Sequence, residues 1–190
     1  MPDVMLLTFA KHMKTLSIML ISLLIAPNLA WGRQRSVQLP LNVRSALNKR
    51  FRNWKFAAVN SDICKFLREN VSADARPEII EGDFDGNGQS DYSVYIVHGK
   101  ASRRIVTAVA LLRKGARVEL HILESGIHTP EPVSFSSGLV LARKGVEAYD
   151  YGTDKKFRYI HDAIILSNFE TSGISYIYEK GKFRSIVTSD

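Results

Sequence analysis

The chain has 190 residues, 45% of them apolar, and 26 Lys and Arg against 19 Asp and Glu give it a formal net charge of +7. This apolar content excludes a disordered chain, and the length suits one globular domain rather than two. The counts of 12 Gly, 6 Pro and a single Cys exclude a collagen-like repeat and a disulfide framework within the chain.

The first 32 residues have the pattern of a secretory signal peptide. Lys11 and Lys14 form a basic start, and an apolar run follows over residues 16–26. Such a run is too short for a membrane-spanning helix, which needs about 20 apolar residues, but it suits the apolar core of a signal peptide. The small residues of Ala30-Trp31-Gly32 then fit a signal peptidase site. We therefore expect cleavage before Arg33.

Cleavage at this point leaves residues 33–190 as a single mature domain in the periplasm or outside the cell. No cysteine follows the small residues, so we expect neither the lipid anchor of bacterial lipoproteins nor a stable membrane span after processing. Three alternatives stay open. They are a cut after Ala30, translation from Met13, and an uncleaved N-terminal helix that anchors the chain.

The start of the mature chain carries a concentration of positive charge. Seven basic residues precede the first acidic residue, Asp62: Arg33, Arg35, Arg44, Lys49, Arg50, Arg52 and Lys55. For an exported protein, such a field favours an anionic polymer of the cell envelope, or an envelope protein, as the partner. Nucleic acid is the less favoured partner, and a merely solvated helix face is the alternative.

Two helices are predicted after the signal peptide. In residues 42–54, apolar side chains recur every three or four positions with Arg and Lys between them, and Asn42 is the expected N-cap. A second helix is expected over residues 61–70, with Ser61 or Asp62 as its cap.

Strands follow these helices. The predicted ranges are 92–98, 104–112, 117–123, 139–142, 146–149, 163–167, 174–179 and 183–188. Lys114-Gly115, Lys144-Gly145 and Lys180-Gly181-Lys182 separate successive strands with the spacing of hairpins. We therefore predict an α+β fold in which N-terminal helices pack on a mainly antiparallel sheet of consecutive hairpins. The lack of a repeat disfavours a propeller or a solenoid.

One segment, residues 83–91, has the spacing of a calcium-binding loop. Oxygen-bearing side chains stand at positions 1, 3, 5 and 9 of this segment: Asp83, Asp85, Asn87 and Asp91. The backbone carbonyl of Gln89 is the expected ligand at position 7, and Gly88 allows the chain to turn at position 6. Calcium takes about six to eight oxygen ligands at about 2.3–2.6 Å, so a tightly coiled loop of this kind predicts a bound Ca²⁺ ion.

The loop is not an EF-hand, because Val94 stands at position 12, where an EF-hand carries a bidentate Glu. It resembles the loop of FG-GAP and VCBS-type repeats, whose pattern is Asp-x-Asp-x-Asp-Gly-x-x-Asp before an apolar strand. The resemblance implies calcium ligands at Asp83, Asp85, Asn87 and Asp91, with Asn87 in place of the third Asp. Integrin-type propellers need many such units, so a single copy does not imply their fold.

A wider resemblance rests on four short segments: Trp54-Lys55-Phe56, Gly82-Asp83-Phe84-Asp85, His161-Asp162-Ala163-Ile164 and Ser189-Asp190. With these, the mature chain resembles small exported bacterial proteins of unknown function that carry one such loop. This resemblance implies an exported address and no activity.

A hairpin turn without metal is the alternative for residues 83–91, because Asp, Asn and Gly also dominate ordinary turns. Against it, three clustered carboxylates without a cation repel one another. Glu81, two residues before the loop, either adds negative charge or faces solvent.

Other candidate chemistry is sparse. Cys64 has no His nearby in the sequence, so we expect a small buried side chain rather than a catalytic thiol. His121 and His128 are a weak candidate zinc pair. His161 and Asp162 are expected on opposite faces of a strand. The histidine nearest to the loop in sequence is His98, which a strand would carry away, so we expect no catalytic base beside the ion.

The favoured interpretation is a non-enzymatic exported domain with one structural calcium site, acting as a binding module for an envelope polymer or protein. The alternative is a hydrolase of envelope material whose catalytic carboxylates are dispersed along the chain. Its candidates are Glu119, Glu124, Glu147 and Glu170.

Overall fold

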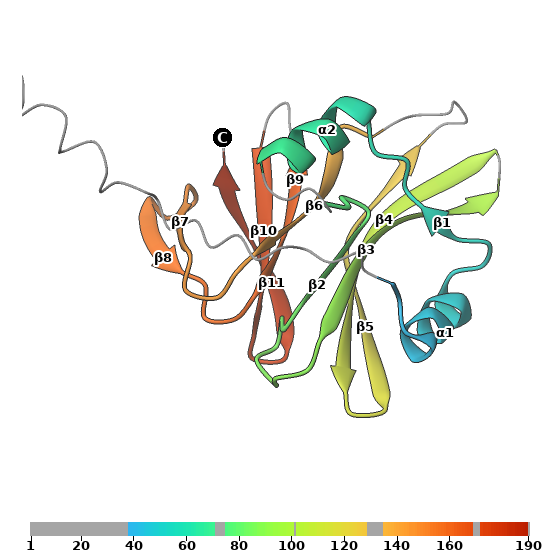
Figure 1. The fold of residues 1–190 in the computed structure, drawn as a ribbon, viewed down its shortest axis with the longest axis horizontal. Helices are drawn as coiled ribbons and strands as arrows, with labels where there is room; N and C mark the ends of the chain where they lie inside the picture. Colours follow the sequence, from blue (N-terminus) through green and yellow to red (C-terminus); the bar gives the residue numbers. More distant parts are fainter. Residues whose placement is uncertain (1–37, 71–74, 101, 129–134, 169–171, 190) are drawn as a thin grey trace, which may run out of the picture. The chain divides into compact units, whose positions relative to one another are not determined.

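Two helices precede the strands in the computed structural model, which describes residues 38–70, 75–100, 102–128, 135–168 and 172–189 (Figure 1). The helices are α1 (Leu41–Arg50) and α2 (Ser61–Asn70). The strands are β1 (Lys55–Phe56), β2 (Ile79–Gly82), β3 (Asp91–Lys100), β4 (Arg103–Lys114), β5 (Arg117–His128), β6 (Ser137–Ala142), β7 (Glu147–Asp150), β8 (Lys155–Arg158), β9 (Ala163–Asn168), β10 (Ser172–Glu179) and β11 (Lys182–Ser189). The predicted signal peptide, 1–32, lies outside the described residues.

The named strands pair antiparallel in two main sheets and a small ribbon. The first sheet has the order β1-β3-β4-β5, and β2 also pairs with β3, at the end where β3 begins. The second sheet has the order β11-β10-β9-β6, while β7 and β8 pair only with each other. The prediction of an α+β fold with helices first and antiparallel hairpins after is confirmed.

The two main sheets bury a shared core between them. Ile80, Ala108 and Leu112 of the first sheet belong to the same buried cluster as Leu139 and Ile164 of the second. The first sheet is apolar on both faces, because its β-strands alternate side chains between this core and α1. On the α1 side, a second cluster joins the helix to β2, β3 and β4: Val43, Leu47, Phe51, Ile79, Tyr92, Val94, Ile96, Val109 and Leu111.

Both expected helix caps are wrong. Helix α1 begins at Leu41, directly after Pro40, and Asn42 lies inside its first turn with its side-chain oxygen accepting from the next backbone N–H. Helix α2 has the predicted bounds, but Asn60 precedes it and accepts a hydrogen bond from the N–H of Asp62 at 2.7 Å. The position before the helix is therefore held by Pro40 in α1 and by Asn60 in α2. No helix in the described part of the chain is long and apolar enough to cross a membrane.

The prediction of a hairpin at Lys144-Gly145 is also wrong. Strand β6 pairs with β9 and strand β7 pairs with β8, so the two strands on either side of this turn never meet. The N–H of Lys144, in this turn, donates to the carboxylate of Asp162 at 3.0 Å. The turns at Gly115 and Gly181 do close hairpins, both with positive φ.

Candidate metal centre

The carboxylate loop, residues 83–91, connects β2 to β3 at one end of the first sheet. Gly82 and Asp91 face each other as Cα partners in the ladder, so both ends of the loop are held by strand pairing. Phe84 is fully buried in the core between the two sheets. The ring therefore anchors the loop to the core, while Gly86, Asn87 and Gly88 at the tip of the loop are exposed.

Three carboxylates converge inside this loop. Asp83, Asp85 and Asp91 each offer one oxygen, and these three oxygens lie within 4.8 Å of one another. The side chain of Asp85 and the whole of Asp91 are 0% exposed. Oδ1 of Asp83 is buried and has no hydrogen-bond partner. Because an unpaired buried oxygen is costly and a cation would satisfy it, this cluster fits a metal ion.

The other carboxylate oxygens hold the coil of the loop. Asp83 Oδ2 accepts a hydrogen bond from the N–H of Gly88 at 2.9 Å, and Asp85 Oδ1 accepts from Asn87 at 3.1 Å. Asp91 accepts from Phe84 at 3.0 Å and from Arg113 of β4 at 2.6 Å. In turns, Asp carboxylates commonly accept hydrogen bonds from nearby backbone N–H groups in this way. This is why a segment rich in Asp and Gly coils here.

Asn87 and Gln89 connect the loop to its surroundings. Asn87 Oδ1 accepts from the N–H of Gln89 at 2.7 Å, and its Nδ2 donates to Asp85 at 3.0 Å and to the carbonyl of Arg113 at 2.7 Å. The Gln89 side chain accepts from the N–H of Gly115 at 3.1 Å, in the turn between β4 and β5. These bonds stabilise the loop, and the roles of Asn87 and Gln89 as metal ligands remain predictions.

The ammonium group of Lys114 contacts the carboxylate cluster at Asp85. Its Nζ donates to Oδ2 of Asp85, and this hydrogen bond is the main reason why the pKa of Lys114 is raised. The same Nζ lies 5.6 Å from the centre of the Tyr178 ring. One ammonium against three carboxylates leaves two negative charges when all of the groups are ionised. Lys114 has no local signal in the sequence, because it reaches Asp85 only through the pairing of β3, β4 and β5.

The pKa of Asp91 shows how burial and the neighbouring carboxylate act on this cluster. Burial raises its pKa to about 6, although the hydrogen bond from the N–H of Arg113 favours the ionised form; the nearby charge of Asp85 raises the pKa further. A buried carboxylate with a raised pKa is one whose negative charge lacks sufficient compensation. A divalent cation in the cluster would supply that compensation.

The loop before β9 brings two further residues to the site. Asp162 Oδ2 accepts from the N–H of Asp83, and the N–H of Asp162 donates to the carbonyl of Asp83, both at 3.2 Å. Asp162 is itself paired with Arg143 at 2.9 Å. The ring of His161 packs against Gly86, where an added Cβ would overlap the imidazole. These contacts join the carboxylate loop to the second sheet.

The expectation that a strand places His161 and Asp162 on opposite faces is therefore wrong. Both residues precede β9 instead of lying within it, so the alternation of a strand does not separate them. They contact the carboxylate loop at Gly86 and Asp83, although Asp162 follows Asp83 by 79 residues in the sequence. The contacts arise from the packing of the two sheets, which sequence spacing does not reveal.

The remaining candidates lie elsewhere. Glu119 lies 4.0 Å from His121 Nε2, which has no hydrogen-bond partner, whereas Glu124 accepts from Tyr176 and Glu147 pairs with two basic residues of β8. These three candidate glutamates therefore lie in separate contacts. Glu170 and the side chain of His128 lie outside the described residues. Burial raises the pKa of the Cys64 thiol, which keeps it in the unreactive protonated form.

Comparisons of the chain with known proteins found no homologue. No protein family, curated protein or solved structure matches the chain. The chemistry of the site is therefore argued from its own residues.

Proposed function

We propose that the chain is an exported binding module whose carboxylate loop takes one Ca²⁺ ion as a structural element. The observation that carries this proposal is the convergence of the Asp83, Asp85 and Asp91 carboxylates, together with the buried Oδ1 of Asp83, which has no hydrogen-bond partner. A turn held only by hydrogen bonds does not need three converging carboxylates and would normally pair this oxygen, since buried polar atoms are nearly always hydrogen-bonded.

The donor set favours calcium over the other common metals. It consists of oxygen atoms, which hard cations prefer, whereas zinc sites usually include Cys or His. Magnesium demands near-octahedral geometry and keeps several water molecules, while calcium accepts irregular sets with six to eight oxygens. The side chain of Asn87 and the backbone carbonyl of Gln89 are the two proposed additional ligands, at positions 5 and 7 of the loop.

The ion would stabilise the junction of three segments. The carboxylate loop is hydrogen-bonded to Arg113 and Gly115 at the turn of β4 and β5, and to Asp162 before β9. An ion that neutralises the loop favours the folded state, because the carboxylates converge only there. Mass action gives a gain of about 2.7 kcal/mol at a calcium concentration 100 times the Kd, and extracellular sites commonly have Kd values of about 0.1 to 1 mM.

The exported address rests on the signal-peptide pattern of residues 1–32. Calcium is abundant outside the cell, so a weak site can be filled there. The partner class in this proposal is an anionic polymer of the envelope or an envelope protein, in keeping with the net charge of +7.

Thermal unfolding in chelator and in calcium at about 10 to 100 mM, roughly 100 times the expected Kd, tests the calcium site. Wild type should gain about 5 to 10 °C in Tm when calcium is in large excess over the Kd. Asp83→Asn keeps the shape of the side chain but removes its charge, so this variant should lose most of the gain. Glu81→Gln is the matched control, because Glu81 lies outside the cluster and the gain should persist. A wild type that melts at the same temperature in both solutions would refute the proposal.

A further inference from the structure

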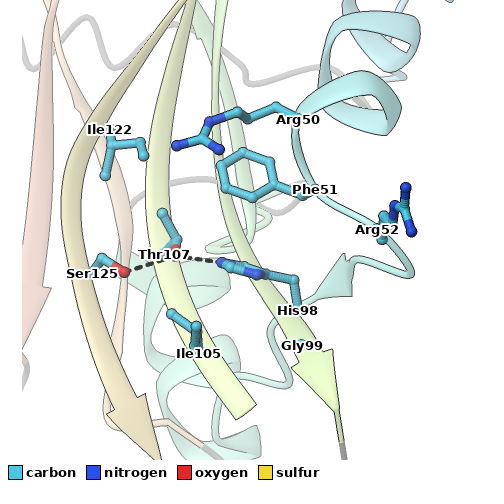
Figure 2. A pocket seen from close by; sticks show the side chains of 9 residues that line it. All are labelled: Arg50, Phe51, Arg52, His98, Gly99, Ile105, Thr107, Ile122 and Ser125. Carbon is cyan, nitrogen blue, oxygen red and sulfur yellow. Dashed lines mark hydrogen bonds between the residues drawn. The ribbon is translucent and has the colours of Figure 1, made fainter. Parts of the chain in front are cut away.

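Two adjacent hollows lie at the end of α1, on the side of the first sheet that the helix covers. The first has a volume of about 310 Å³ and includes Arg50, His98 and Ser125 in its lining (Figure 2). The second has a volume of about 770 Å³ and lies between α1 and β1. Phe51 and Arg52 line both hollows, so the two adjoin at these residues. We call the two together the basic surface.

All of the ionised side chains that line the basic surface are positively charged. Its lining includes four cations, Arg44, Arg50, Arg52 and Lys55, and no Asp or Glu. Within the described residues, none of these four forms a salt bridge with a carboxylate. Figure 2 shows Arg50 beside Phe51, and Arg52 leaving the chain in the other direction. Arg50 lies 5.7 Å from the centre of the Phe51 ring, but no described carboxylate compensates these four cations, so their charge is available to an anionic ligand.

Aromatic and amide side chains stand among these cations in the second hollow. The indole N–H of Trp54 donates to the side-chain oxygen of Asn48 at 2.8 Å, which holds the ring in place. Phe56 meets Trp54 edge to face, with ring centres 5.4 Å apart. A second amide, that of Asn53, also lines this hollow. The guanidinium of Arg76 lies 5.8 Å from the centre of the Phe56 ring, so one face of that ring is already in contact. The Trp54 ring and the other face of Phe56 remain as apolar surfaces for a sugar ring, and the amides donate to and accept from its hydroxyl groups.

The floor of the first hollow carries a chain of hydrogen bonds. His98 Nε2 lies 3.0 Å from the hydroxyl of Thr107, which lies 3.1 Å from the hydroxyl of Ser125 (Figure 2). Thr107 is 1% exposed, whereas Ser125 is open to solvent. Burial lowers the pKa of His98, and the charge of Arg50 lowers it further, so the ring is neutral at neutral pH. This end of the basic surface therefore offers the hydroxyl of Ser125, held by Thr107, together with the guanidinium of Arg50.

We propose that the basic surface binds an acidic polysaccharide, through carboxylate or phosphate groups at its cations and sugar rings at its aromatic side chains. The inference rests on the proposed function for the exported address. A polymer suits two hollows that share Phe51 and Arg52 better than a single small ligand does. The rings of Trp54 and Phe56 stand 83° apart, which suits a chain of turning sugar rings better than a continuous stack of bases.

Binding of the purified protein to immobilised polymers, in calcium and at several salt concentrations, tests the inference. The acidic probes are polygalacturonate for carboxylates and a phosphomannan for phosphates, and the neutral probe is dextran. We expect at least one acidic polysaccharide to bind, with affinity falling as salt rises, and to bind more tightly than dextran. Stronger binding of one acidic probe would tell which anionic group is preferred.

Paired variants locate the binding. Arg52→Gln combined with Lys55→Gln should weaken binding about tenfold, since each exposed ion pair contributes about 0.2 to 1 kcal/mol. Lys65→Gln combined with Lys182→Gln removes the same charge from exposed positions elsewhere and should leave the affinity unchanged. Equal losses in the two double variants would overturn the inference, because the binding would then depend on net charge alone.

Two further probes decide between polymer classes. Equal or tighter binding of polyglutamate, or of single-stranded oligothymidine, would overturn the assignment to a polysaccharide, as would the absence of binding to both acidic polysaccharides. The calcium-dependent shift in Tm is measured on the same samples. If binding fails while that shift persists, only this inference fails; if the shift is absent while binding persists, only the calcium site fails.

Discussion

The carboxylate loop and the basic surface carry charges of opposite sign, and they differ in how far the protein buries and compensates those charges. In the loop, Asp85 and Asp91 are buried and hydrogen-bonded to the chain, and a single ammonium partly offsets three carboxylates. On the basic surface, exposed cations such as Arg52 and Lys55 have no carboxylate partner within the described residues. Buried charge must be compensated for the fold to be stable, whereas exposed charge costs little and can act on a partner. The loop should therefore determine stability, and the basic surface should determine binding.

The largest expected effect on stability is that of Asp91→Ala. The variant leaves the N–H groups of Phe84 and Arg113 without their acceptor. An unsatisfied buried donor costs about 1 to 3 kcal/mol, so we expect a loss of about 2 to 4 kcal/mol even in chelator. Urea unfolding in chelator measures it. A free energy of unfolding equal to that of wild type would show that Asp91 does not hold the loop in the absence of metal.

Gly86→Ala and Gly88→Ala form a matched pair within the loop. Both glycines have positive φ, 74° and 80°, but a Cβ at Gly86 would overlap the His161 ring whereas Gly88 has nothing within 4 Å. Gly88→Ala should cost about 1 to 2 kcal/mol for its backbone, and Gly86→Ala about 1 kcal/mol or more beyond that. Equal losses in urea unfolding would contradict the contact with His161. Adding His161→Ala should relieve the extra loss in Gly86→Ala.

Lys114→Gln alters the compensation of charge inside the loop. The ammonium group bonds to Asp85 and would repel a cation beside it, so its removal should tighten calcium binding about three- to tenfold. The Kd for calcium, measured by titration, checks the direction. Weaker binding in the variant would mean that Lys114 supports the ion-bound geometry instead of competing with the ion.

The smallest expected effect on stability belongs to the basic surface. Arg52→Gln combined with Lys55→Gln should change the free energy of unfolding by about 0.5 kcal/mol or less, because exposed side chains without ion pairs contribute little to the fold. Urea unfolding is again the measurement. A loss as large as that of Asp91→Ala would abolish the contrast between the two regions.

The sequence predicted what depends on neighbouring residues. The carboxylates of Asp83, Asp85 and Asp91 lie within nine residues, so their spacing alone indicated that they converge. Apolar periodicity likewise predicted α1 and α2, although α1 ends at Arg50, before Phe51 adopts an extended backbone. The charge of the basic surface was visible as a run of Arg and Lys.

What the sequence missed depends on long-range packing. Lys114 and Asp162 reach the loop through strand pairing and through the contact of two sheets, and neither has a local signal. Strands β1 and β2 are too short, at two and four residues, for a period-two pattern to be recognised. The hollows around Arg52 form only when the end of α1 packs beside β1 and the first sheet.

Calorimetric titration of calcium into protein stripped of metal tests the central claim most directly. We predict one site per chain, with a Kd of about 0.1 to 1 mM, the common range for extracellular sites. The same titration of Asp83→Asn should show binding that is much weaker, because that variant removes the charge beside the unpaired oxygen. No binding to wild type at millimolar calcium, or equal binding to Asp83→Asn, would contradict the assignment of the carboxylate loop as a calcium site.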